Sequence, residues 1–137
     1  MLTNPHLAFE AMIFAHEIHA TQVRKYTLNP YTDHLAEVAG YVAVSVPRPL
    51  IGAATAVSWL HDSAEDQGIT YAELVWRFGY LVANGVWHLT DREVGNRATR
   101  KALACHRVAK APGWVQTVKV ADGISNYRSI QQHDPKF

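Results

Sequence analysis

The sequence has a single cysteine, Cys105, and no long uncharged apolar run. One cysteine excludes an internal disulfide and any cysteine-rich zinc site, and it is compatible with a reducing compartment. No uncharged apolar stretch approaches the roughly 18 residues that span a bilayer, so no membrane contact is expected. The N-terminus has no basic residue before its apolar part and is interrupted by Glu10 and His16, which is not the pattern of a signal peptide. We therefore expect a cytoplasmic protein.

Charged residues are also few. They make up 18% of the 137 residues, against 48% that are apolar. This balance excludes a disordered chain and is typical of a globular protein. A chain of this length can bury roughly two thirds of the surface that it exposes when unfolded. Because no repeat, low-complexity segment or linker interrupts the sequence, we predict one domain over residues 1–137.

The net charge of +1 conceals an uneven distribution along the chain. Residues 1–91 hold four Lys and Arg against nine Asp and Glu, whereas residues 92–128 hold eight against two. An acidic segment followed by a basic one allows opposite charges to converge on one site, as a pocket for a metal and a phosphate requires. The alternative is that both segments are solvated helix faces.

The hydrophobic spacing is helical along nearly the whole chain. Asn4 is a suitable N-cap with Pro5 in the first helical position, and Thr70 with Glu73 forms a capping box. The predicted helices cover residues 5–23, 32–46, 50–66, 70–78, 80–90, 96–110 and 112–126. The segment "YVAVSV" would also suit a strand, but the sequence offers it no partner strand. We predict an all-α fold, a single helical bundle.

The motif "HDSAED", residues 61–66, follows directly on the apolar run "IGAATAVSWL". It places Asp62, Glu65 and Asp66 where the hydrophobic pattern points into the core. Burying isolated carboxylates is costly unless a cation or strong donors compensate. Either the chain turns out to solvent here, or a positive group lies inside. His61 and Glu65 are four residues apart, so their side chains share one part of a helical surface.

Two further residues are candidate partners for the adjacent pair His61 and Asp62. His34 follows the turn "NPYTD", and Asp122 stands in the apolar segment "WVQTVKVADGI". Together the four would offer two nitrogens and two carboxylates to one divalent ion and leave positions for water and substrate. Other interpretations stay open: His34 as a cap or surface residue, the pair as an ordinary helix end, and Asp122 as an N-cap or surface acid.

The order of these pieces resembles a known family. The segments "HATQVRKY", "NPYTDH", "AVSWLHDSAED", "RFGYLVANGVWHLTD" and "VKVADGISN" occur in this order. This is similar to the HD-domain metal-dependent phosphohydrolases, and within them to the RelA/SpoT-type alarmone hydrolases, including the stand-alone small alarmone hydrolases. The resemblance covers about residues 8–128 and implies that the helical bundle is an HD domain.

The resemblance implies roles for six residues of the metal and water sites. The positions that match the family's metal ligands are His34, His61, Asp62 and Asp122, and the usual ion of the family is manganese. Glu65 and Asp66 match the catalytic acidic pair, which is thought to orient or deprotonate the attacking water. The chemistry is consistent, because a divalent ion lowers the pKa of bound water and a nearby carboxylate can take the proton.

The resemblance also implies a substrate. Arg24 and Lys25 match the "RK" of the nucleotide pocket, and Asn126 matches the asparagine that closes the last motif. The family hydrolyses the 3′-pyrophosphate of guanosine tetra- and pentaphosphate (ppGpp and pppGpp), and some relatives accept NADPH. The alternatives are an HD-domain nucleotidase, a dNTP or NADPH phosphohydrolase, and a nucleotide-binding protein with weak catalysis.

A basic stripe follows the last acidic segment. Arg97, Arg100 and Lys101 stand at i, i+3 and i+4 in "NRATRKA", so they share one helix face. We interpret the stripe as a clamp for substrate phosphate, with a solvated face as the alternative. Interleaved aromatics and a recognition motif are lacking, so no nucleic-acid partner is expected. The expected partner is a small nucleotide, and a homo-oligomer is left open.

The sequence departs from the family pattern at several positions. Leu35 and Gln67 stand where relatives usually have proline and threonine, and the loop "YTLN" replaces a charged glycine turn. The sequence ends eleven residues after Asn126, where relatives continue with a further helix. We therefore expect a shortened C-terminal helix without counterparts for the pocket residues that this region supplies in relatives.

Overall fold

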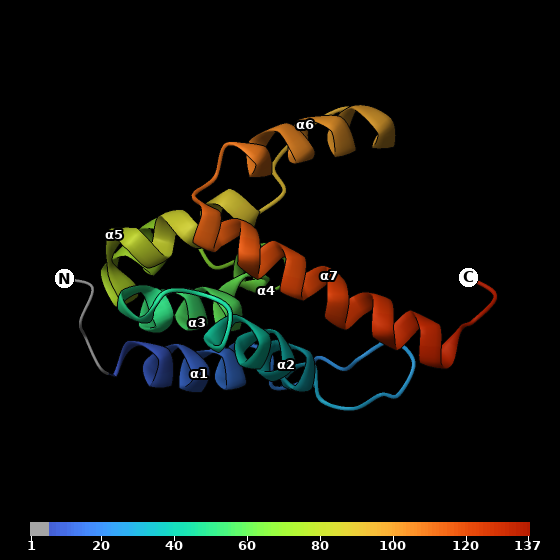
Figure 1. The fold of residues 1–137 in the computed structure, drawn as a ribbon, viewed down its shortest axis with the longest axis horizontal. Helices are drawn as coiled ribbons and strands as arrows, with labels where there is room; N and C mark the ends of the chain where they lie inside the picture. Colours follow the sequence, from blue (N-terminus) through green and yellow to red (C-terminus); the bar gives the residue numbers. More distant parts are fainter. Residues whose placement is uncertain (1–5) are drawn as a thin grey trace.

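The computed structural model describes residues 6–137, which form a bundle of helices (Figure 1). The elements are α1 (Leu7–Ile18), α2 (Thr32–Ala43), a 3₁₀ turn η1 (Arg48–Leu50), α3 (Ile51–Leu60), α4 (Ser63–Gln67), α5 (Tyr71–Leu89), α6 (Arg97–Ala109) and α7 (Gly113–His133). Within residues 6–137 the only β-type pairing is one bridge between Val23 and Pro30. The predicted all-α class is confirmed, and the first half of "YVAVSV" lies in α2 while the second half forms the turn that follows it.

Helix α3 is the centre of the core. All of its residues from Ala53 to Leu60 are buried, as expected for a helix that is apolar all round. It contacts α1, α2, α5 and α7. The apolar run before "HDSAED" is therefore inside the protein, and it holds the start of that motif against the core.

The loop between α1 and α2 is fixed by its own backbone. The Arg24 N–H donates to the Asn29 carbonyl at 2.8 Å, and the Tyr31 N–H donates to the Gln22 carbonyl at 2.9 Å. This pairing draws the backbone out of helical geometry, so the prediction that the first helix runs to about Val23 is wrong and α1 ends at Ile18. The predicted cap at Asn4 and Pro5 lies outside the described residues.

The helix predicted over residues 50–66 is interrupted at the motif itself. Helix α3 ends at Leu60, His61 and Asp62 form a turn, and α4 begins at Ser63. The break coincides with a side-chain bond from the His61 ring to the Ser58 carbonyl, which occupies a carbonyl of the last turn of α3. The prediction of one continuous helix is wrong here, and the prediction that helix two reaches Val46 is wrong by about one turn, because α2 ends at Ala43.

Helix α5 begins and bends as the sequence predicts. The Thr70 hydroxyl accepts the Glu73 N–H at 3.1 Å, but the Glu73 carboxylate accepts from Arg77 at 2.9 Å instead of returning to the cap. Gly79 has φ 84° and ψ 172°, a backbone conformation that favours glycine. The break predicted at this glycine is confirmed as a kink within α5.

Gly85 lies where α5 approaches its neighbours most closely. A Cβ at this position would stand 2.7 Å from a methyl carbon of Val57 on α3 and 3.0 Å from the Trp114 ring on α7. Such distances leave no space for a side chain. Three helices therefore meet at this glycine, and two of them carry or adjoin predicted site residues.

The last two helices differ in how they are attached. Helix α6 contains no buried residue and lies apart from the body of the bundle (Figure 1). Its predicted bounds are confirmed, with Asn96 accepting the Thr99 N–H at 2.9 Å. Helix α7 packs on α2 and α3 and continues to His133, beyond the end predicted near Asn126. None of the described helices combines the length and apolarity needed to cross a membrane.

Candidate functional site

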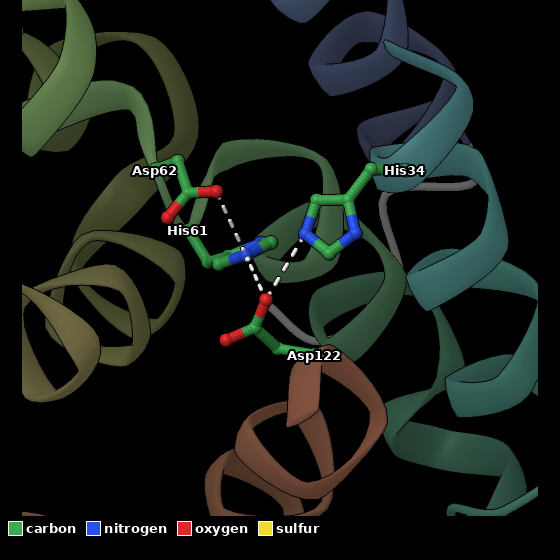
Figure 2. Close-up of side chains that lie close together, drawn as sticks. All are labelled: His34, His61, Asp62 and Asp122. Atoms are coloured by element: carbon green, nitrogen blue, oxygen red, sulfur yellow. Dashed lines mark hydrogen bonds and ion pairs between the residues drawn. The ribbon is translucent and has the colours of Figure 1, made fainter. Parts of the chain in front are cut away.

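Four predicted ligands meet in one cluster (Figure 2). His34 comes from α2, His61 and Asp62 from the turn between α3 and α4, and Asp122 from α7. One ligand atom of each lies within 4.8 Å of the others. Asp122 Oδ1 is 3.0 Å from His34 Nε2 and 3.2 Å from His61 Nε2, and His61 Nε2 is 3.1 Å from Asp62 Oδ2. The cluster therefore joins segments 88 residues apart in sequence.

Both histidines are buried and held through their second ring nitrogen. His61 Nδ1 lies 2.7 Å from the Ser58 carbonyl, and because a carbonyl only accepts, this nitrogen carries a proton and donates. His34 Nδ1 lies 2.8 Å from the Ser125 hydroxyl. Such partners fix the ring orientation and leave Nε2 as the ligand atom. In His61, a neutral ring would aim the Nε2 lone pair at two carboxylates, so a positive charge is needed between them.

The pKa shifts of the cluster residues also indicate that a positive charge is favoured between the carboxylates. Burial by itself lowers the pKa of His61, but the carboxylates of Asp62 and Asp122 outweigh it and hold this pKa well above its ordinary value. Burial by itself raises the pKa of each carboxyl group, but the bonded imidazoles of the cluster bring the pKa of Asp62 and of Asp122 below the ordinary value. Two nitrogens and two ionised carboxylates suit a divalent cation. The residues present therefore fit the metal that the resemblance implies.

Tyr31 is a residue of the cluster that the sequence analysis missed. Its hydroxyl donates to Asp62 Oδ2 at 2.5 Å, and burial together with the Asp62 carboxylate raises its pKa. The hydroxyl therefore stays protonated and remains a donor. The signal was present in "NPYTDH", where Tyr31 stands three residues before His34 and can approach the same site from the start of α2.

A cavity of about 140 Å³ opens beside the cluster. It is lined by Tyr31, His61, Asp62, Glu65, Leu89, Asp91, Lys119, Asp122 and Asn126. Glu65 accepts the backbone N–H of Asp91 at 2.5 Å, which holds one carboxylate oxygen. Burial and the neighbouring carboxylates raise the pKa of Glu65. Asp91 and Lys119 are further lining residues that the sequence did not single out.

Glu65 and Asp66 face different surroundings. Glu65 lines the cavity, whereas the Asp66 carboxylate accepts from the Gln22 side chain at 3.0 Å and is not among the described lining residues. Gln67 also donates to Gln22, at 2.9 Å. The pair is thus divided between the cavity and the loop after α1. A shared water-handling role for Asp66 stays a prediction.

The predicted nucleotide residues lie on one side of the cavity. Arg24 donates to the Asn126 side chain at 3.1 Å, and Asn126 in turn donates to Asp122 Oδ1 at 3.1 Å. A second cavity, of about 380 Å³, is lined by Arg24, Lys25, Tyr26, Asn126, Ser129, Ile130 and Phe137. Asn126 lines both cavities, so the "RK" pair adjoins the cluster through this residue.

The basic stripe lines a different cavity from the one that Arg24 and Lys25 line. Arg97, Arg100, Lys101 and Ala104 line a third cavity, of about 320 Å³, together with Asp91 and Glu93. Asp91 borders both this cavity and the one beside the cluster. The structure thus brings the stripe near the acidic residues that precede it. Whether the stripe binds phosphate stays a prediction.

Arg107 attaches the stripe's helix to the rest of the protein. Its guanidinium donates to Glu93 at 2.7 Å, to Asp91 at 2.5 Å and to the His88 carbonyl. The hydrogen bond from Arg107 lowers the pKa of Glu93 to about 2, and the same pairing raises the pKa of Arg107. The loop that carries Asp91 is therefore fixed from α6, and Asp91 in turn holds Glu65.

Comparison with known proteins supplies similar chains. No family model matches the sequence. The guanosine-3′,5′-bis(diphosphate) 3′-pyrophosphohydrolase MESH1 of Xenopus tropicalis is 29% identical over 140 residues, which cover 99% of this chain and 76% of that protein. The MESH1 of Drosophila melanogaster is 29% identical over 137 residues, covering 98% and 76%.

A longer relative and a solved structure agree with these. The probable guanosine-3′,5′-bis(diphosphate) 3′-pyrophosphohydrolase of Synechocystis is 32% identical over 143 residues, which cover 98% of this chain but 18% of that protein. A solved structure, described as a metazoan ortholog of SpoT that hydrolyzes ppGpp and plays a role in starvation responses, superimposes with a TM-score of 0.81 at 25% identity. The match covers 93% of this chain and 71% of the solved one.

Proposed function

We propose that the chain is a RelA/SpoT-type HD-domain phosphohydrolase, as its similarity to the MESH1 proteins and to the solved ortholog of SpoT indicates, and that it hydrolyses the 3′-pyrophosphate of ppGpp. The observation that carries the proposal is the cluster of two histidines and two aspartates beside a cavity that also contains Glu65. Relatives named for this activity match 98–99% of the chain. Both a site for phosphate chemistry and a substrate class therefore support the same reaction.

The metal in this proposal is a divalent ion, with Mn²⁺ as the proposed identity. The residues that would hold it are His34, His61, Asp62 and Asp122. When bound, such an ion lowers the pKa of a bound water and polarises a phosphoryl oxygen. The chain's own contribution is to fix the ligands: Ser58 and Ser125 orient the rings, and Tyr31 orients Asp62.

Glu65 is the proposed base. A water oxygen bonds to the phosphorus attached to O3′, and the P–O3′ bond breaks. Glu65 takes a proton from the attacking water and later returns it to solvent, and O3′ leaves as a hydroxyl with a proton from solvent water, so that GDP and pyrophosphate are the products of ppGpp. The raised pKa of Glu65 makes it a better proton acceptor, and its bond to the Asp91 N–H holds it toward the cavity.

The remaining residues are proposed to bind the nucleotide. Arg24, Lys25 and Asn126 would bind it on the side of the larger cavity, and the stripe of Arg97, Arg100 and Lys101 would neutralise phosphate on the other side. Arginine and lysine suit this task because they pair with phosphate oxygens through charge-assisted hydrogen bonds. The two side cavities adjoin the central one through Asn126 and Asp91.

A product analysis tests the proposal. The metal-loaded protein is incubated with ppGpp, pppGpp, NADPH and mono- and triphosphate nucleotides, and the released phosphate species is identified. Pyrophosphate from ppGpp is the expected result. Orthophosphate would instead indicate a nucleotidase or NADPH phosphatase, and tripolyphosphate a dNTP triphosphohydrolase.

Saturable nucleotide binding without any release would indicate a binding protein. Glu65→Gln serves as the catalytic control, because it keeps the size of the side chain and removes the base. Release that persists undiminished in this variant would mean that Glu65 is not the base.

A further inference from the structure

The cavity beside the cluster is strongly acidic for a site that is to accept a phosphate. Its lining includes the carboxylates of Asp62, Glu65, Asp91 and Asp122. Like charges repel an anionic ligand. One divalent ion offsets two of the four negative charges and Arg107 pairs with Asp91, which still leaves one carboxylate charge without a cation. A phosphate in this cavity therefore needs a further cation close to it.

Lys119 is the only lysine or arginine among the described residues that line this cavity. It stands on α7 at three residues before Asp122 and seven before Asn126, so the three side chains share one helix face. About half of its side chain is exposed, at 51%. Its ammonium group is therefore accessible from the cavity without any movement of the helix.

The ammonium group of Lys119 also has donors to spare. Its ion-pair partner among the described residues is Asp122, whose Oδ2 lies 3.7 Å away, which is longer than a hydrogen bond to a carboxylate. The other oxygen of Asp122, Oδ1, faces His34, His61 and Asn126. Asp122 thus has one oxygen toward the ring nitrogens that would hold the metal and the other toward Lys119.

We propose that Lys119 binds the substrate's 3′-diphosphate in the cavity and stabilises the pyrophosphate as it departs. This inference rests on the proposed function and adds a residue that neither the motif comparison nor the basic stripe identified. Negative charge accumulates on the diphosphate as the P–O3′ bond breaks, and an ammonium group beside it lowers the energy of that charge. Lys119 contributes its charge only and does not supply the proton for O3′.

A competing role for Lys119 is purely structural. Through its weak contact with Asp122 it could serve only to orient that carboxylate toward the metal. The two roles separate experimentally, because loss of an orienting contact weakens metal binding, whereas loss of a phosphate contact weakens phosphate binding with the metal still in place.

The test compares Lys119→Met and Lys119→Arg with the unaltered protein. Metal content is measured after gel filtration, and binding of inorganic pyrophosphate is measured by calorimetry with Mn²⁺ kept in excess. We expect Lys119→Met to retain the metal, to bind pyrophosphate roughly 10- to 100-fold more weakly, as the loss of one charge-assisted hydrogen bond predicts, and to raise KM for ppGpp. Lys119→Arg should recover much of the pyrophosphate affinity.

Lys110→Met is the matched control, because Lys110 is an exposed residue at the end of α6 and lines none of the three cavities. Pyrophosphate affinity within twofold of the unaltered protein in Lys119→Met would overturn the inference, and so would loss of the metal in that variant. If the unaltered protein releases no pyrophosphate from ppGpp, the proposed function fails. The calorimetry then still decides on its own whether Lys119 binds phosphate.

Discussion

The cluster of two histidines and two aspartates and the helix α6 are stabilised by different interactions. The cluster stands against the buried helix α3, and each of its histidines is fixed at both ring nitrogens. Helix α6 has no buried residue and depends on Arg107 for its described side-chain ion pairs to the preceding loop. The proposed chemistry thus occupies the well-packed part of the molecule, and the proposed phosphate stripe occupies the part with little apolar burial.

This difference has an energetic meaning. Regions with few buried apolar contacts open at a smaller free energy than core helices. The ion pairs that hold such a region are weakened by added salt, which screens the charges. They are also weakened at low pH, which protonates the carboxylates, whereas apolar packing has no charge to screen or titrate. We therefore expect substitutions in the cluster to abolish chemistry, and substitutions around α6 to change substrate binding and local opening.

Removal of a proposed metal ligand should have the largest effect on metal content and on hydrolysis. His61→Ala or Asp122→Ala should lose the bound divalent metal and reduce hydrolysis by more than about 100-fold, since even the partners of metal ligands contribute 10- to 100-fold. Metal analysis and activity assays measure both effects. Full metal retention in both variants would show that the cluster is not a metal site, and Lys110→Met provides a control that keeps the metal.

Removal of the proposed base separates chemistry from binding within the bundle. Glu65→Gln should retain the metal and the nucleotide affinity but lower kcat by roughly 10²- to 10⁴-fold, the range for loss of a general base. Steady-state kinetics and metal analysis give the result. Glu73→Gln is the matched control, because its carboxylate lies on the exposed face of α5 and pairs with Arg77. Unchanged kcat in Glu65→Gln would remove this residue from the mechanism.

Loss of the ion pairs of Arg107 should loosen α6 and leave the packing around α3 unchanged. Arg107→Met removes the guanidinium that bonds Glu93, Asp91 and the His88 carbonyl. We expect faster amide hydrogen exchange in α6, unchanged exchange in α3, and a KM for ppGpp several-fold higher, about the effect of one lost charged contact. Arg77→Met, which removes an exposed pair within α5, should leave exchange in α6 unchanged. Equal acceleration of amide exchange in α3 and in α6 would contradict the view that α6 opens independently of the core.

The same attachment should depend on pH in a defined window. Arg107 lowers the pKa of Glu93 from 4.5 to about 2, so the pairing stabilises the folded protein fully above pH 4.5. Its contribution is lost as the pH falls from there toward about 2, because Glu93 then gains a proton. The difference in urea midpoint between the unaltered protein and Arg107→Met should therefore shrink across this range. A constant difference would mean that Glu93 is not the partner that matters.

The smallest expected effect concerns the stripe itself. Arg100→Ala should raise KM for ppGpp several-fold and leave kcat nearly unchanged, because it removes a contact made equally in the bound substrate and in the transition state. Steady-state kinetics at low salt give the clearest result, since screening weakens exposed charges. If KM does not change, the stripe is a solvated helix face and does not bind phosphate.

The local patterns of the sequence predict much of this molecule, and long-range contacts account for what they miss. The capping residues Thr70 and Asn96 mark helix starts correctly, because a cap depends on residues three positions away. The four ligands are predicted from a motif order, and the structure brings them together. Tyr31, Asp91 and Lys119 were missed, because their relevance depends on contacts with distant segments, such as Asp62 for Tyr31 and Glu65 for Asp91.

The errors have the same origin. The first helix ends early because its C-terminal residues pair with a returning loop, and periodicity does not reveal such pairing. The role of Asp66 beside Glu65 is not among these errors and stays a prediction, although the two carboxylates face different surroundings. In the structure Asp66 accepts from Gln22, 44 residues away.

Gly85 has a consequence for anyone who transplants this site into another protein. Val57 lies one helical turn before His61, and Trp114 lies on the helix that carries Asp122. The absent side chain at Gly85 thus lets α5 pack against α3, which ends directly before His61, and against α7, which carries Asp122. A design that grafts the four proposed ligands onto a generic helical bundle would copy these residues but not this spacing. Such a design must therefore also copy Gly85, which lies outside the four proposed ligands and the residues that line the cavity.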